Sequence, residues 1–253
     1  MAIIEEERPL ALEAGETVTV AEKPLGALSR PQGDTGWKSW LFTVDHKKIG
    51  IMYGAAALVF FVIGGIEALL IRIQLSRPDN SFLSEDVYNQ VFTMHGVTMI
   101  FLAAMPLAAA FANYLLPLQV GARDVAFPRL NAFSFWCFLA GAIFLNTSWF
   151  LGGAPDGGWF AYAPNTSATF SPSNGMDFYA LGLQILGIAS LVSAINLIVT
   201  VLNMRAPGMS LLKMPVFTWM MLVVQFLLLF AMPVIAIALF LLTFDRSFDA
   251  NFF

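Results

Sequence analysis

His95 is the side chain of this 253-residue sequence that points most directly to a cofactor. It lies in the stretch QVFTMHGVTMIF, about one turn inside a long apolar run, and Gly96 follows it directly. A glycine next to a histidine lets a flat macrocycle approach the backbone closely. A neutral imidazole is also the commonest axial ligand of heme iron. The spacing leaves two roles open for His95, a heme ligand and a hydrogen-bonded packing residue.

A second group of polar side chains lies inside or beside the apolar runs. Asn113 follows His95 in the same run, about 27 Å further along a helix axis. Asp124 lies in the connecting string VGARDVAFPRLN. The complete group is Asn113, Asp124, Asn131, Ser134, Ser190, Ser193 and Asn196. These residues are typical of hydrogen bonding between membrane helices. They would equally suit a water-filled proton path, in which a carboxylate collects protons and amides and hydroxyls hold water.

Five further residues carry expectations. Glu67 and Arg72 lie near the end of the first apolar run, so they should face protein, cofactor or water rather than lipid. His46 lies beside two lysines and is expected to be a solvated residue at the membrane surface. Trp159 and Tyr162 lie in the loop string GGAPDGGWFAYAP, which is more specific than an interfacial aromatic belt requires.

The composition indicates a polytopic membrane protein. Hydrophobic residues make up 58% of the chain and charged residues 12%, whereas soluble domains have about 45–50% and about 25%. The net charge of −4 and the single cysteine exclude a nucleic-acid binder and a disulfide scaffold. Five windows are free of charge; they lie between Lys48 and Glu67, Asp86 and Arg123, Arg129 and Asp156, Asp177 and Arg205, and Lys213 and Asp245.

Each charge-free window is long enough for one membrane-spanning helix. The runs are continuously apolar rather than alternating, which favours helices over barrel strands. We therefore predict an all-α, polytopic membrane helical bundle with five transmembrane helices. The expected spans are 49–75, 91–118, 130–152, 178–203 and 215–243. A sixth uncharged window, 157–176, is rich in Gly, Pro, Ser and Asn and is predicted to be a long loop.

Lysines and arginines gather in the connections on one side of the predicted bundle, which places that side and the N-terminus in the cytoplasm. The residues on this side are Lys38, Lys47, Lys48, Arg123, Arg129, Arg205 and Lys213, against Arg77 and Arg246 on the other. Residues 1–36 form a polar tail rich in glutamate, without the apolar segment of a signal peptide. We expect this tail to be disordered and cytoplasmic.

Six strings in the sequence resemble subunit I of the heme–copper oxygen reductases, most closely the bacterial cytochrome c oxidases. They are VDHKKIGIMY, TMHGVTMIFLAAMP, NYLLPLQVGARDVAFPRLNAFSFW, GGAPDGGW, AINLIVTVLNMRAPGM and DRSFDANFF. They occur in order and the resemblance covers about residues 37–253. It implies the N-terminal part of the cytochrome c oxidase subunit I fold.

The resemblance implies a role for each matching position. His95 matches an axial ligand of the low-spin heme, of type a, and Arg72 matches the arginine that hydrogen-bonds the formyl group of that heme. Trp159 and Tyr162 match a loop that covers the heme region from the outer side. Asp124 matches the entrance of the D proton pathway. The remaining matches to that pathway are Asn113 and Asn131 beside its entrance, and Ser134, Ser190 and Asn196 further along.

The resemblance further implies part of the catalytic subunit of a respiratory terminal oxidase in the bacterial cell membrane. Such an oxidase couples cytochrome c oxidation and O₂ reduction to proton transport. Subunit I in this family has about twelve spans, and copper and the high-spin heme are bound by the later ones. We therefore expect about half of a subunit here, without the oxygen-reduction site and inactive alone. The expected partners are the remaining half of subunit I, other oxidase subunits and cytochrome c, with no nucleic acid.

Two alternatives stay open. Quinol oxidases of the same family share several of these strings, and their quinol site uses Arg, Asp, His and Gln. The matching positions here are Ile63, Glu67, Val87 and Gln90. The arginine and the histidine of the quinol site are absent, which favours cytochrome c as the electron donor. The other alternative is a non-catalytic, truncated membrane module.

Overall fold

The computed structural model describes residues 36–253 of the chain, so the predicted acidic tail lies outside the described residues apart from Gly36. The described part contains helices and connections and no strand. The elements are α1 (Lys38–Leu41), α2 (His46–Gln74), α3 (Glu85–Val97), the π-helix η1 (Thr98–Ala104), α4 (Met105–Val120), α5 (Pro128–Thr147), the 3₁₀ turn η2 (Ser148–Phe150), α6 (Gly175–Asn203), the 3₁₀ turn η3 (Leu211–Lys213) and α7 (Val216–Phe248).

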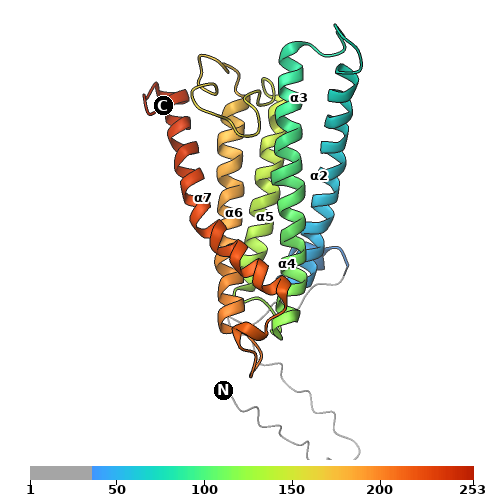
Figure 1. Ribbon diagram of the computed structural model, residues 1–253, viewed down its shortest axis with the longest axis vertical. Helices are drawn as coiled ribbons and strands as arrows, with labels where there is room; N and C mark the ends of the chain where they lie inside the picture. The colour runs from blue at the N-terminus through green and yellow to red at the C-terminus, as the bar shows by residue number, and fades with distance from the viewer. Residues whose placement is uncertain (1–35) are drawn as a thin grey trace, which may run out of the picture. The chain divides into compact units, whose positions relative to one another are not determined.

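Five of these helical stretches are long and apolar enough to cross a membrane, which confirms the all-α bundle with five spanning helices. They are His46–Gln74, Glu85–Val120, Pro128–Phe150, Gly175–Asn203 and Val216–Phe248. Figure 1 shows them side by side, with the connection between α5 and α6 at one end of the bundle and the connection between α4 and α5 at the other. We call these the His95 end and the Asp124 end. The long loop predicted from the sequence is the connection 151–174 at the His95 end.

The second spanning helix begins earlier than predicted, at Glu85 instead of residue 91. Ser84 caps it, because its hydroxyl accepts a hydrogen bond from the Val87 backbone N–H. Glu85 and Asp86 occupy the first turn, where negative charge stabilises the positive end of the helix dipole. The charges that excluded this turn from the predicted span therefore help to start the helix.

A π-helical segment, η1, lies in the middle of that helix and was not predicted. Pro106 follows one residue after the segment, behind Met105. A proline supplies no N–H and its ring clashes with the carbonyl four residues earlier, here that of Leu102. The wider π turn lets the helix accommodate Pro106 without ending. The span from Glu85 to Val120 therefore continues as one element.

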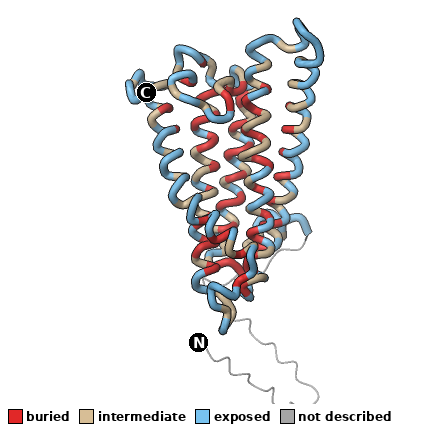
Figure 2. The backbone as a smooth tube through the Cα atoms, viewed as in Figure 1, coloured by how far each residue is buried: buried red, intermediate tan, exposed pale blue. Residues whose placement is uncertain are grey.

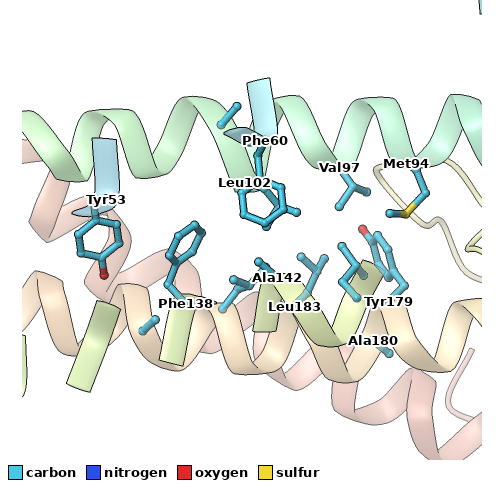
Figure 3. Packing of buried hydrophobic residues seen from close by; sticks show 14 of the residues in the cluster. Tyr53, Phe60, Met94, Val97, Leu102, Phe138, Ala142, Tyr179, Ala180 and Leu183 are labelled. Atoms are coloured by element: carbon cyan, nitrogen blue, oxygen red, sulfur yellow. The ribbon is translucent and has the colours of Figure 1, made fainter. Parts of the chain in front are cut away.

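Neighbouring helices enclose a core between α2, the α3–α4 helix, α5 and α6. Tyr53 packs edge-on against Phe135 with ring centroids 5.1 Å apart, and its ring lies 5.4 Å from that of Phe138. Figure 3 shows Tyr53 and Phe138 together with Leu102 and Met94 of the second spanning helix. A second, smaller core joins α4, α6 and α7 towards the Asp124 end, around Leu116 and Leu197.

Burial is concentrated on the inner faces of the bundle, and exposed residues cover its outside (Figure 2). Leu58, Phe61 and Leu69 on α2 are each more than half exposed although they are large and apolar. A monomeric soluble protein rarely exposes such a continuous apolar surface. Helix α7 is the least buried span; it changes direction along its length in Figure 1 and contains Pro233. The outer faces of these helices suit contact with lipid or with further spans.

Close backbone contact at the start of α6 depends on Gly175. A Cβ atom at this position would overlap the backbone carbonyl of Ala154 in the 151–174 loop. Gly175 is buried, and the backbone on both sides is held in place by helix α6 and by the loop. The absence of a side chain therefore lets the loop lie directly against the helix.

We expect Gly175→Ala to destabilise the protein by about 1–3 kcal/mol, because the overlapping atoms are backbone and cannot rotate away. Gly65→Ala in α2 is the matched control, since a Cβ there meets no atom within 4 Å. Thermal unfolding in detergent measures both variants. An unchanged midpoint for Gly175→Ala would contradict the close approach of loop and helix.

Candidate functional site

His95 is held by the backbone of the neighbouring helix. Its Nδ1 lies 2.9 Å from the backbone carbonyl oxygen of Gly64 in α2. A carbonyl can only accept, so this hydrogen bond assigns the ring proton to Nδ1 and leaves a lone pair on Nε2. A hydrogen bond from the ring nitrogen that does not face the metal orients a metal-binding imidazole and fixes its tautomer. The half-buried ring of His95 therefore fits an axial ligand of heme iron.

The expectation for Gly96 was wrong in its detail. The space next to this glycine is occupied by Trp159, because a Cβ atom on Gly96 would lie 2.9 Å from the Cβ and 3.1 Å from the Cδ1 of that tryptophan. Gly96 therefore allows the 151–174 loop, rather than a macrocycle, to approach the helix. Trp159 itself is 40% exposed.

The 151–174 loop is attached to α3 and α6 beside Trp159. The backbone N–H of Gly158 donates to the buried hydroxyl of Thr93 at 2.9 Å. The backbone N–H of Ala154 donates to the side-chain oxygen of Gln90 at 3.1 Å. The hydroxyl of Tyr179 in α6 donates to the backbone carbonyl of Trp159. Two of these bonds therefore attach the loop to the helix of His95, close to that residue, and the third attaches it to α6.

The other residues expected near a cofactor differ in exposure. Tyr162 is 64% exposed and stacks with Phe160 at a ring-centroid distance of 4.6 Å. Arg72 is exposed in the last turn of α2, at the His95 end. Glu67, one turn earlier, is 6% exposed and thus faces protein as expected. The structure therefore places Arg72, Trp159 and Tyr162 at the same end of the bundle as His95, with Trp159 packed beside it.

Asp124 lies at the opposite end, in the connection between α4 and α5. Its carboxylate accepts a hydrogen bond from the Val125 backbone N–H at 2.8 Å, and the residue is 8% exposed. Gly121 ends α4 in the left-handed conformation, with φ of 76°. The following turn is joined to the connection between α6 and α7, since the Ala206 backbone N–H donates to the Val120 carbonyl at 2.8 Å.

Asn196 holds the same connection from the side of α6. Its Oδ1 accepts from the backbone N–H of Phe127 at 2.8 Å, and its Nδ2 donates to the carbonyl of Phe127 at 3.2 Å. Thr200, one turn later, accepts from the Ala126 backbone N–H at 2.9 Å. Asn196 thus joins two helices in the way that asparagine does in many membrane bundles.

His46 is buried, contrary to the expectation of a solvated residue. It is 2% exposed, and its Nδ1 lies 2.8 Å from the backbone carbonyl of Asn113. The two histidines of the sequence therefore connect the same pair of helices at opposite ends. His46 of α2 binds the backbone of α4, and His95 of α3 binds the backbone of α2.

The asparagines near the Asp124 end retain unpaired polar atoms. Asn113 donates from Nδ2 to the Ala109 carbonyl at 2.9 Å, but its buried Oδ1 bonds to no described residue. Asn131 is fully buried, and neither its Oδ1 nor its Nδ2 bonds to any residue from 36 to 253. A buried polar group without a partner costs about 1–3 kcal/mol, and buried water commonly satisfies such groups. Both amides are therefore suited to holding water.

Ser134 links Asn131 to the interior of the bundle. Its hydroxyl donates to the Asn131 backbone carbonyl at 2.7 Å, and the hydroxyl of Tyr53 donates to it at 3.2 Å. Tyr53 also lines a cavity of about 300 Å³, to which Ser190 and Ser193 contribute from α6. The other residues that line the cavity are mostly apolar, and His95 is not among them. Ser190 and Tyr53 therefore line the same cavity, and Tyr53 connects that cavity to Ser134 through its hydrogen bond.

Tyr53 and Thr93 were not predicted, and Gln90 was singled out only as a match to the quinol site. Tyr53, Gln90 and Thr93 make hydrogen bonds that only the folded helices reveal, and each is an ordinary residue in its local string. His46 was singled out, but its neighbouring lysines indicated the wrong surroundings. The signal that could have revealed its burial is Asp45, which caps α2 and places His46 on the first turn of the span.

The family model described as Cytochrome C and Quinol oxidase polypeptide I matches residues 48–253. The chain is 55% identical to cytochrome c oxidase subunit 1 of Bacillus subtilis over 224 residues, which are 88% of this chain and 36% of that protein. It is 56% identical to cytochrome c oxidase subunit 1 of Bacillus sp. strain PS3, over 85% of this chain and 35% of that protein. It is 50% identical to quinol oxidase subunit 1 of Bacillus spizizenii, over 86% of this chain and 33% of that protein.

The chain therefore spans about a third of the length of the curated relatives it matches, rather than the half expected from the sequence. The family match covers all five spanning helices except the first two residues of α2. This match and the identities of 50% and more show that the chain belongs to the cytochrome c and quinol oxidase polypeptide I family, the subunit I family of the heme–copper oxidases.

Proposed function

We propose that this chain is part of the catalytic subunit of a respiratory terminal oxidase that oxidises cytochrome c and reduces O₂ to water. Its own contribution is one axial ligand of a low-spin heme, His95, together with a proton path that begins at Asp124. The observation that carries the proposal is the hydrogen bond from His95 Nδ1 to Gly64, which leaves Nε2 available for a metal in a membrane helix.

A low-spin heme of type a would supply reversible one-electron transfer at this site. The protein holds the ligand ring in one tautomer through Gly64 and covers its helix with Trp159. Arg72, exposed in the last turn of α2, is available to hydrogen-bond a polar edge group of the macrocycle. Trp159 and Tyr162 belong to the loop that would separate the heme from water on the outer side.

The proposed proton path starts at Asp124 and continues through side chains that can hold water. Asn113 and Asn131 offer buried atoms without partners among the described residues. Ser134 and Tyr53 continue from Asn131 to the cavity that Ser190 lines. We include Asn196 in the path because it lies beside the connection between α4 and α5 that carries Asp124. Its amide is hydrogen-bonded to the backbone of Phe127. These contacts support a water path over simple bonding between helices.

The two sites lie at opposite ends of the bundle. With the N-terminus in the cytoplasm, as the distribution of lysine and arginine predicts, the Asp124 end faces the cytoplasm and the His95 end faces outward. Electrons and protons would then arrive from different sides of the bacterial cell membrane. Moving one charge across the membrane is worth about 2.3 kcal/mol per 100 mV, so this separation stores energy.

Copper and the high-spin heme would be bound by the rest of subunit I, together with the site of O₂ reduction. The chain alone would hold a heme ligand and part of a proton path and would be inactive. Its partners would be the remaining two thirds of subunit I, other oxidase subunits and cytochrome c. The outer face of α7, which is largely exposed here, is suited to packing against those further spans.

Replacing His95 tests the heme ligand. In the intact oxidase complex, His95→Ala should abolish the absorption band of the low-spin heme, because the iron loses an axial ligand. His95→Met should retain a low-spin heme with a shifted band, because a thioether can also coordinate the iron axially. An unchanged band in an assembled His95→Ala complex would contradict the assignment and favour a non-catalytic membrane module.

Replacing Asp124 tests the proton path. Asp124→Asn should slow proton uptake in the assembled enzyme by about a hundredfold, the lower range of what a positioned acid–base group contributes. Asp249→Asn is the control, since Asp249 lies after α7 at the other end and an asparagine tolerates its left-handed conformation. Normal uptake in Asp124→Asn would exclude Asp124 from the path.

The electron donor is tested by substrate replacement, since relatives of both kinds match this chain. We expect oxygen uptake by the purified complex with reduced cytochrome c to exceed that with a quinol. Of the four positions that match the quinol site, Ile63 and Val87 are apolar, and the oxygen of the Gln90 amide is engaged with Ala154. Faster uptake with quinol would assign the chain to the quinol oxidases instead.

A further inference from the structure

Arg246, near the end of α7, is the best-bonded side chain at the His95 end. Its side chain is 3% exposed although it carries a full charge. The guanidinium has five N–H donors, and all five are used. Nε donates to Asp177 Oδ1 at 2.6 Å and Nη2 to Asp177 Oδ2 at 3.4 Å. The other three bonds go to the backbone carbonyls of Thr166, Ser171 and Ser173, at 2.7, 2.8 and 2.8 Å.

These acceptors belong to the 151–174 loop and to the first turn of α6. The second half of the loop has turn hydrogen bonds of its own, such as that from the Ser171 backbone N–H to the Ser167 carbonyl at 2.9 Å. Three further carbonyls directed at the guanidinium of Arg246 tie this half of the loop to α7. A planar guanidinium is suited to this task because its donors have fixed directions. Lysine would provide one charge point and only three donors.

The part of the loop that Arg246 holds is in contact with the part that covers His95. Thr166 is fully buried, and a Cβ atom on Gly157 would lie 2.5 Å from its methyl group. The Thr166 backbone N–H also donates to the carbonyl of Tyr162 at 3.2 Å. The loop residue Trp159 lies between Gly157 and Tyr162 and packs on Gly96.

The loop therefore has two anchors. On one side, Thr93 of α3 binds the Gly158 backbone and Tyr179 binds the Trp159 carbonyl. On the other side, Arg246 of α7 binds the segment from Thr166 to Asp177. Loss of the first anchor would release Trp159 directly. Loss of the second would leave the loop attached at one side only.

We propose that Arg246 is a positioning residue that sets how closely the 151–174 loop covers the heme bound at His95, and thereby sets the reduction potential of that heme. The proposal rests on the proposed function, since it requires a heme at His95. A ferric heme carries one more positive charge than a ferrous heme, so exposure to water favours the ferric state. Burial and local dielectric are among the means by which a protein tunes heme potential.

Replacement of Arg246 in the intact oxidase complex tests this proposal by two measurements. The first is hydrogen exchange of the 151–174 amides, which reports the loop without reference to activity. The second is a redox titration of the low-spin heme, followed by its absorption band. For Arg246→Gln we expect faster exchange in the loop and a lower potential, seen as a smaller reduced fraction at a fixed ambient potential. Arg246→Lys should give a smaller change in both.

Arg205 provides the matched control at the Asp124 end. It also donates to three backbone carbonyls, those of Val201, Leu202 and Met209, at 2.6, 3.0 and 3.1 Å. Arg205→Gln should therefore loosen the connection between α6 and α7 but leave the heme potential unchanged. Asp177→Asn gives a second test, because it removes the charge pair and leaves the three carbonyl acceptors in place.

The outcomes separate this proposal from the proposed function. If Arg246→Gln loosens the loop and leaves the potential unchanged, or changes neither, Arg246 is a structural residue and the inference is overturned. If the complex with Arg246→Gln does not assemble, the redox titrations of Arg246→Lys and Asp177→Asn decide in its place. An unchanged heme potential in these variants overturns the inference. An equal shift of the heme potential in Arg205→Gln would also overturn the inference. If the low-spin band is insensitive to replacement of His95, the proposed function fails first.

Discussion

The need to satisfy every polar group without bulk water governs this molecule. In hydrocarbon an unpaired backbone or side-chain group costs several kcal/mol, so spanning segments are helical and their polar side chains must find partners inside the bundle. Most do so through backbone carbonyls. His46 and His95 each bind a carbonyl of the other helix, and Arg246 binds three. The amides of Asn113 and Asn131 depart from this pattern, with buried atoms that bond to no described residue.

The two ends of the bundle meet this need differently. At the His95 end a long loop closes over the helices, and its backbone is held by side chains from α3, α6 and α7. At the Asp124 end short connections are held to one another, while unpaired amides remain inside. The loop at the His95 end also keeps buried atoms that bond to no described residue, Oδ1 of Asp156 and Oγ of Ser173. Its closure over the helices suits a cofactor that must be shielded from water. An end with unpaired buried amides suits the passage of protons through bound water.

The sequence predicts the helices well because charge is excluded from hydrocarbon, and the five windows without charge mark the five spans. It predicts the ends less well, since Glu85 and Asp86 lie in the first turn of a helix they were expected to precede. The π-helix before Pro106 was not foreseen, because periodicity alone does not show how a helix absorbs a proline. His46 and Gly96 were misjudged for a common reason. Their surroundings are set by segments far away in the chain, Asn113 and Trp159, which local strings do not reveal.

The paired histidines also fix the vertical register of the first two spans. The number of residues from His46 to Gly64 equals that from His95 to Asn113. The two hydrogen bonds therefore join the antiparallel helices at two levels that are equally far apart in sequence on both. A slide of one helix by a single turn, about 5.4 Å, would break both bonds at once. The two hydrogen bonds therefore oppose sliding of one span past the other. The depth of the heme iron proposed to bind at His95 would then be set by α2, and loop movements at the surface would change its surroundings without changing its position along the membrane normal.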